Sequence, residues 1–152
     1  MLKRKKDDFL TEEQISEIQK KISEIEKETS GEIVVSIKKK LNFIEKKKTV
    51  VELAKKEFRR IKIAVNENSS GILIFIVPKR REFCFLPDNK ILSLLKEDFL
   101  QTLIEDMKRK FNERRYFDGI IDSIEEIGKY LRLKLPSKPD DKNDLPNEIQ
   151  FN

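Results

Sequence analysis

A helix ends and a buried strand begins at residues 28–37, and this corner constrains the fold more than any other stretch of the chain. Before the corner, apolar residues recur at helical spacing, and Thr11 with Gln14 forms a capping box where that helix is expected to begin. Gly31 suits the turn after a helix. Residues 33–37 are almost all β-branched and apolar, which is typical of a strand covered on both faces. The sequence therefore predicts a helix followed directly by a buried strand.

Two further strands are predicted in the middle of the chain. Residues 71–77 are continuously apolar after the first Gly, and residues 81–86 follow them across a short turn, so the two strands are expected to pair antiparallel. Residues 50–61 carry an apolar stripe at helical spacing. A strand, a helix and a strand in succession predict a parallel pair with a right-handed crossover.

The rest of the chain predicts helices followed by a proline-rich tail. Apolar stripes indicate helices within residues 89–95, 100–111 and 120–131. We expect a single α/β domain over residues 1–135 and an extended Pro/Asp-rich tail over residues 136–152, in which residues 148–151 are a candidate edge strand. The expected fold is a three-layer α/β/α sandwich with a small mixed sheet of three to five strands.

Charge and composition favour a soluble cytoplasmic protein. The formal net charge is +5, but basic runs are spread along the chain with acids between them, which favours a solvated surface over a nucleic-acid or anionic-membrane footprint. No DNA or RNA partner is therefore expected. The single cysteine, Cys84, excludes an internal disulfide. The apolar run at residues 72–77 is too short to span a membrane, and no apolar signal region follows the basic start.

Several kinds of chemistry are excluded by residue types. The chain contains no His, which excludes a Ser-His-Asp or Cys-His arrangement and His-ligated zinc. It contains no Walker loop and no dinucleotide-binding Gly pattern. Cys84 alternates with Phe83 and Phe85 in a predicted strand, so we expect an inert packed thiol.

Four segments of the sequence occur in an informative order. They are residues 28–35; Ala54 and Phe58 leading to residues 70–74 and Asp88; Phe111, Tyr116, Phe117, Gly119 and Ile120 with Gly128 and Leu131; and residues 143–148. Together they resemble the TPM-domain family, over nearly the whole chain, and especially its short soluble bacterial members. The resemblance implies an α/β/α sandwich. It also implies phosphatase-like activity or divalent-cation binding, as in some members, or a role in the assembly or repair of membrane complexes, as in others.

The chain departs from the family pattern at several positions. Ser69 and Ser70 replace the usual Arg-Asn, Lys90 the usual Gly after Asp88, Phe99 the usual Trp, and Leu135 the usual His. Loss of the Arg and the Gly weakens the case for inherited phosphate or metal chemistry.

Candidate ligands gather at one edge of the predicted sheet. Glu32 opens the first strand, whereas Asp88 and Asn89 follow the third, which is expected to run antiparallel to the first. Ca²⁺ and Mg²⁺ prefer such oxygen ligands, so a calcium or magnesium site at Glu32, Asp88 and Asn89 is one hypothesis. Additional oxygens could come from Thr29, Ser30, Asp118 and Asp122. The alternative is that Asp88 and Asn89 only cap a helix and that the hydroxyls only satisfy a turn. No catalytic residue is assigned.

Three functions follow from these observations, in order of preference. The first is a binding or accessory module that contacts a protein partner, at a membrane or envelope complex. The second is a divalent-cation-dependent phosphatase of low activity, with Glu32 and Asp88 as metal ligands and Asn89 orienting water or substrate. The third is nucleic-acid binding through the basic runs, which rests on the sequence pI of about 9.2 alone.

Overall fold

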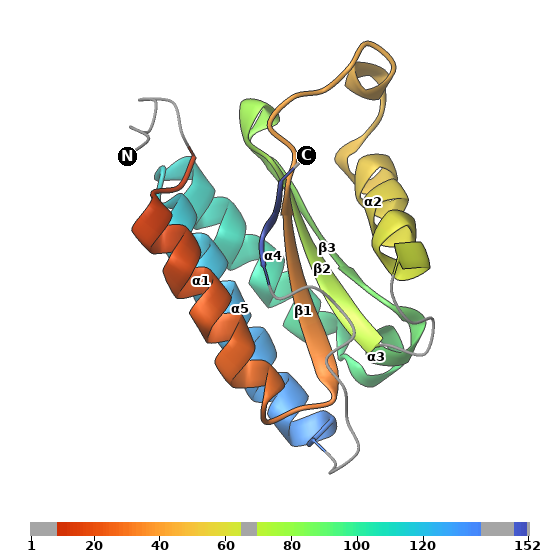
Figure 1. The fold of residues 1–152 in the computed structure, drawn as a ribbon, viewed down its shortest axis with the longest axis vertical. Coiled ribbons are helices and arrows are strands. Elements are labelled where there is room, and N and C mark those ends of the chain that lie inside the picture. The colour runs from red at the N-terminus through yellow and green to blue at the C-terminus, as the bar shows by residue number, and fades with distance from the viewer. Residues whose placement is uncertain (1–8, 65–69, 138–147, 152) are drawn as a thin grey trace.

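A mixed sheet lies between two layers of helices in the computed structural model of the protein (Figure 1). The structure describes residues 9–64, 70–137 and 148–151, and these residues form four strands in one sheet. The strands are β1 (Gly31–Ile37), β2 (Ser70–Val77), β3 (Glu82–Pro87) and β4 (Gln150–Phe151). Their order is β3-β2-β1-β4, with β1 parallel to both β2 and β4, and β2 antiparallel to β3. The predicted parallel pair and the antiparallel hairpin are both present.

The helices form the two outer layers. They are α1 (Glu12–Glu26), α2 (Val50–Ala64), α3 (Asn89–Leu94), α4 (Glu97–Asn112) and α5 (Tyr116–Lys134), with short 3-10 turns η1 (Glu45–Lys47) and η2 (Pro78–Arg80). Helices α1, α4 and α5 cover one face of the sheet and α2 covers the other, while α3 lies beside the start of β2 and follows the end of β3 (Figure 1). The three-layer α/β/α sandwich predicted from the sequence is confirmed.

Local signals explain where α1 begins. The hydroxyl of Thr11 accepts a hydrogen bond from the N–H of Gln14 at 3.1 Å, and the Gln14 side chain accepts one from the N–H of Thr11 at 2.9 Å. This reciprocal cap satisfies two N–H groups that would otherwise lack partners at the helix start. The apolar stripe of α1 then buries Ile18, Ile22 and Ile25 against the sheet and α5.

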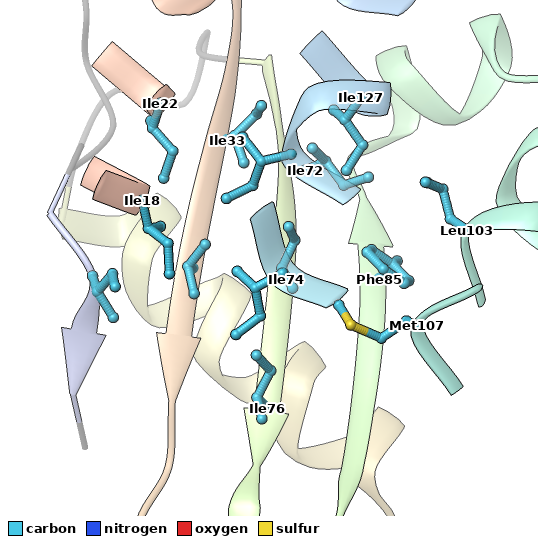
Figure 2. Packing of buried hydrophobic residues seen from close by; sticks show 14 of the residues in the cluster. Ile18, Ile22, Ile33, Ile72, Ile74, Ile76, Phe85, Leu103, Met107 and Ile127 are labelled. Carbon is cyan, nitrogen blue, oxygen red and sulfur yellow. The ribbon is translucent and has the colours of Figure 1, made fainter. Parts of the chain in front are cut away.

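The central strands are buried on both faces, which is why their sequences are almost uninterruptedly apolar. One set of alternate residues packs under α1, α4 and α5, as Figure 2 shows for Ile33, Ile72, Ile74 and Ile76. The other set, with Val34, Leu73, Phe75 and Val77, packs under α2. Burying a Val, Ile, Leu or Phe side chain contributes about 1.5–3 kcal/mol, so this double-sided core dominates the stability of the fold.

Among the boundaries that differ from the sequence prediction, two have a backbone cause. β3 begins at Glu82 rather than residue 81, because Arg81 adopts a left-handed conformation (φ 53°) that closes the turn after β2. The last helix begins at Tyr116, earlier than the apolar stripe suggests, because the break before it is confined to Arg114 (φ 61°) and Arg115.

The C-terminal end of the described chain returns to the sheet. Within the candidate edge strand at residues 148–151, Gln150 and Phe151 pair in parallel with Ser36 and Ile37 of β1. Most of the predicted tail, residues 138–147, lies outside the described residues, as do residues 1–8. Across the described helices, none has the length and apolar character needed to cross a bilayer.

Candidate functional site

The structure places the predicted acids at the same edge of the sheet but on either side of β2. Glu32 of β1 pairs with Gly71 of β2. Asp88, which follows β3, bonds to Gly71 from the other side. Adjacent strands lie about 4.8 Å apart, so the backbones of Glu32 and Asp88 are separated by roughly 10 Å. The two acids share an edge, as the topology predicts, with one strand between them.

Asp88 caps a helix, which was the alternative to metal binding that the sequence left open. Its Oδ1 accepts a hydrogen bond from the N–H of Ile91 at 2.9 Å, which caps α3. Its Oδ2 accepts one from the N–H of Gly71, also at 2.9 Å. A carboxylate oxygen can accept more than one hydrogen bond, so capping alone does not prevent cation binding.

The remaining candidates differ in exposure and in partners. Glu32 is buried, whereas Asn89 is exposed in the first turn of α3. Thr29 is buried, and its hydroxyl donates to the carbonyl of Leu135 while accepting from the N–H of Gly31 at 3.0 Å. The Thr29 hydroxyl therefore joins the start of β1 to the end of α5.

Two acids that the sequence offered as additional ligands lie elsewhere. Asp118 and Asp122 lie near the beginning of α5, whereas the end of α5 meets the start of β1. Asp118 instead pairs with Arg115 at 3.0 Å, and Asp122 pairs with the buried Lys110 of α4. In the part of the chain that the structure describes, no three Cys, Asp or Glu side chains form a group suited to a metal ion. A calcium or magnesium site at Glu32, Asp88 and Asn89 would thus depend on carbonyl and water oxygens for most of its coordination.

A pocket of about 280 Å³ opens between α2 and the sheet. It is lined by Lys38, Glu45, Leu53, Lys56, Glu57, Arg60 and Phe75. Glu57 is buried beside β1, where it accepts a hydrogen bond from the hydroxyl of Ser36 and pairs with Arg60 at 2.6 Å. The hydrogen bond that the Arg60 guanidinium donates to Glu57 raises the pKa of Arg60. Two ion pairs lie in the wall of the pocket, Glu57 with Arg60 and Glu45 with Lys38, and they neutralise most of its charge.

Sequence reasoning missed this pocket, although one signal was present. Glu57 lies on the buried stripe of α2, three residues after Ala54 and four before Ile61. Ser36 is likewise a polar residue in the apolar first strand. When two apolar surfaces face each other and each carries one polar side chain, the two side chains are expected to form a buried hydrogen bond, because buried polar groups need partners.

Cys84 is half-buried in β3, and burial raises the pKa of its thiol, although Lys55 acts in the opposite direction. A raised pKa leaves little thiolate at neutral pH, so Cys84 is a poor nucleophile. This agrees with the expectation of an unreactive thiol.

The loop between β1 and α2 contains a turn braced by its own side chains. Asn42 and Glu45 cap each other: the N–H of Asn42 donates to Glu45 Oε1 at 2.9 Å, and the N–H of Glu45 donates to Asn42 Oδ1 at 2.8 Å. Lys38 pairs with the other oxygen of Glu45 at 3.0 Å. Between the two capping residues, Phe43 is 75% exposed and Ile44 is 68% exposed. The turn therefore holds two apolar side chains in solvent.

Comparison with known proteins places these features in a family. The TPM domain matches residues 4–130. The NMR structure of the BA42 protein from the psychrophilic bacterium Bizionia argentinensis is similar at a TM-score of 0.82 and 30% sequence identity, covering 97% of this chain and 99% of that chain. No curated protein sequence matches the chain. The chain therefore belongs to the TPM domain family.

Proposed function

We propose that this TPM-domain protein is a cytoplasmic accessory module that binds a membrane or envelope complex and catalyses no reaction of its own. The observation that carries the proposal is the braced turn, in which Asn42 and Glu45 cap each other and hold Phe43 and Ile44 in solvent. Exposed large apolar side chains on a rigid turn lose little conformational entropy on binding, which suits a contact surface.

The candidate catalytic groups support binding rather than turnover. Asp88 uses both carboxylate oxygens to hold main-chain N–H groups. Cys84 has a raised pKa. Both acids of the pocket beside α2 are in ion pairs, Glu45 with Lys38 and Glu57 with Arg60.

Photo-crosslinking tests the contact surface directly. A photoreactive phenylalanine analogue in place of Phe43 is expected to crosslink proteins of the host membrane fraction after irradiation of living cells. The matched control carries the same analogue in place of Leu133, which is equally exposed (75%) but lies at the end of α5. Equal crosslinking from both positions, or none from position 43, contradicts the proposed contact.

We also propose that the module binds Ca²⁺ or Mg²⁺ weakly at Glu32, Asp88 and Asn89. The support is that all three residues lie at the edge of the sheet where β1 begins and β3 ends, with Asn89 exposed to solvent. Titration of labelled protein with either cation is expected to shift the amide signals of Gly31, Glu32, Asp88 and Asn89 in NMR spectra. Asn89→Ala is expected to reduce these shifts without unfolding the protein. Unchanged spectra at millimolar metal contradict the site.

A phosphatase of low activity is the second candidate, and the shared edge of Glu32 and Asp88 favours it. Metal-assisted hydrolysis needs a bound cation and an activated water, which two acids and Asn89 could position. Hydrolysis of p-nitrophenyl phosphate by the purified protein with Mg²⁺ or Ca²⁺, abolished by Asp88→Asn, would establish this candidate and refute the non-enzymatic module. We expect no hydrolysis above the rate with protein omitted.

A further inference from the structure

Positive charge is concentrated at one end of the molecule, although the basic runs are spread along the sequence. The loop at residues 38–49 and the turn at residues 78–81 contain nine Lys and Arg against one Glu, a formal charge of +8. The whole chain carries +5, so all other residues together carry −3. The one acid, Glu45, is buried and paired with Lys38. The exposed charge of these two segments is therefore entirely positive.

Hydrogen bonds join the two segments into one surface, which we call the basic tip. The guanidinium of Arg80 donates to the carbonyl of Lys48 at 2.7 Å and to that of Lys46 at 2.8 Å. The loop rises beyond the end of the sheet at the top of Figure 1, beside the turn that links β2 and β3. Because Arg80 and the Asn42–Glu45 cap hold the backbone at both ends of η1, the shape of the tip is set before any partner binds.

Apolar side chains lie among the basic groups of the tip. Phe43 and Ile44 are the most exposed large apolar side chains of this loop. The ammonium of Lys47 lies 4.6 Å from the centre of the Phe43 ring. At the neighbouring end of β4, the ring of Phe151 is 45% exposed with the ammonium of Lys39 at 5.1 Å. Aromatic rings with cations beside them suit the boundary between lipid headgroups and acyl chains.

We propose that the basic tip docks on the surface of an anionic phospholipid bilayer, with Phe43 and Ile44 entering the headgroup region. This inference rests on the proposed role at a membrane complex and names the surface that the module binds. A bilayer matches both properties of the tip, because its phosphates attract the Lys and Arg side chains and its interface accepts Phe and Ile. A nucleic acid would match the charge of the tip but would leave the exposed Ile44 in water, whereas a bilayer interface accepts it.

Vesicle binding tests the proposal. The full chain is expected to co-sediment with vesicles of phosphatidylcholine and phosphatidylglycerol, to bind pure phosphatidylcholine far less, and to dissociate as salt is raised. The chain contains no Trp, so Phe43→Trp introduces a single tryptophan, whose emission can be excited selectively near the red edge of protein absorption. Its emission is expected to shift to shorter wavelength on the anionic vesicles and to be quenched by brominated acyl chains. Absence of co-sedimentation at low salt overturns the proposal.

Matched variants separate insertion from charge. Phe43→Ser with Ile44→Ser is expected to weaken vesicle binding roughly tenfold or more, since two apolar side chains leave the interface. Leu133→Ser, equally exposed elsewhere, is expected to leave binding unchanged. Replacing Lys46, Lys47 and Lys79 by Gln is expected to weaken binding about fivefold for each residue. Replacing the exposed Lys20, Lys108 and Lys129 by Gln removes the same charge outside the tip and is expected to have a much smaller effect.

The outcomes distinguish this proposal from the proposed function. If the Phe43/Ile44 pair is dispensable while the Lys replacements abolish binding, the tip is a general polyanion surface, and bilayer insertion is refuted. If crosslinking from position 43 succeeds but vesicles do not bind, the module contacts protein alone, and the lipid proposal fails while the proposed function stands. NMR spectra of each variant confirm that it is folded.

Discussion

Asp88 and Gly71 are joined by two hydrogen bonds that run in opposite directions. The N–H of Asp88 donates to the carbonyl of Gly71, and the N–H of Gly71 donates to Oδ2 of Asp88, both at 2.9 Å. Oδ1 of the same carboxylate caps α3 through the N–H of Ile91. One side chain thereby fixes the start of β2, the end of β3 and the start of α3.

Replacing Asp88 by Ala is expected to destabilise the protein by about 2 kcal/mol. The change removes a helix cap, worth about 1 kcal/mol, and leaves the buried N–H of Gly71 without its acceptor. Urea unfolding followed by circular dichroism measures the loss. Asn89→Ala, at the neighbouring exposed position, is the control and is expected to change stability by less than about 0.5 kcal/mol. Equal effects at both positions would contradict a special structural role for Asp88.

The cap between Asn42 and Glu45 predicts that Glu45→Ala loosens the basic tip. The hydrogen bond from the N–H of Asn42 lowers the pKa of Glu45, burial opposes this, and Lys38 lowers it further. The lowered pKa means that the stabilisation is present above the usual Glu pKa and is lost as pH falls through the folded value. We expect a loss of about 1 kcal/mol at neutral pH and faster amide hydrogen exchange at residues 42–45. Glu24→Ala, an exposed change in α1, should do neither.

The elements of this fold were predictable where a single local pattern determines them. The capping box at Thr11 and Gln14, the stripe of α1 and the apolar runs of β1 and β2 each specify their own structure. The order of these elements then required a parallel pair and a hairpin. The exact start of β3 was not predictable, because Arg81 takes a positive φ that Gly or Asn more often adopts.

The surfaces proposed for function were harder to predict because they depend on contacts between distant residues. The basic tip arises when Arg80 bonds to carbonyls more than thirty positions earlier in the chain. Read along the sequence, the same basic runs looked like parts of a uniformly solvated surface. Topology alone predicted that Glu32 and Asp88 share an edge of the sheet, but the strand between the two acids followed only from the observed pairing.

Close packing of α1 against α5 predicts that Gly128→Ala is destabilising. A Cβ at Gly128 would lie 2.6 Å from Cδ1 and 2.9 Å from Cγ1 of the buried Ile25. Overpacking of this kind costs about 1–3 kcal/mol, which exceeds the gain of about 1 kcal/mol from replacing Gly by Ala in a helix. Thermal unfolding should show a lower midpoint for the variant.

Two further variants test the cause of that loss. A Cβ at Gly119, also in α5, would meet chiefly Sδ of Met107 at 2.8 Å, the movable part of a flexible side chain. Gly119→Ala is therefore expected to leave stability unchanged or to raise it by up to about 1 kcal/mol. Ile25→Val removes Cδ1 and should reduce the cost of Gly128→Ala in a double-mutant cycle. Additive effects of the two changes would contradict a steric cause.

Lys110 joins α4 to α5 through a pair of acids, and its removal is expected to change the pH dependence of stability. Its ammonium lies 2.8 Å from Asp106 and also bonds to Asp122. Burial disfavours its charged form, but the hydrogen bonds to both acids outweigh burial and raise the pKa of Lys110. The hydrogen bond from Lys110 in turn lowers the pKa of Asp106, with burial opposing and Arg109 adding to the effect.

These directions determine the sign of the effect. The contribution of Asp106 is present above its usual pKa of about 4 and is lost as pH falls through the lower folded value, whereas that of Lys110 persists until pH exceeds its raised pKa. Lys110→Met is therefore expected to cost about 2 kcal/mol at neutral pH and less at pH values below the Asp range. Urea unfolding across this range measures the difference, with the exposed Lys108→Met as control. A cost that stays constant from neutral to acidic pH would show that Lys110 stabilises the helices by packing alone.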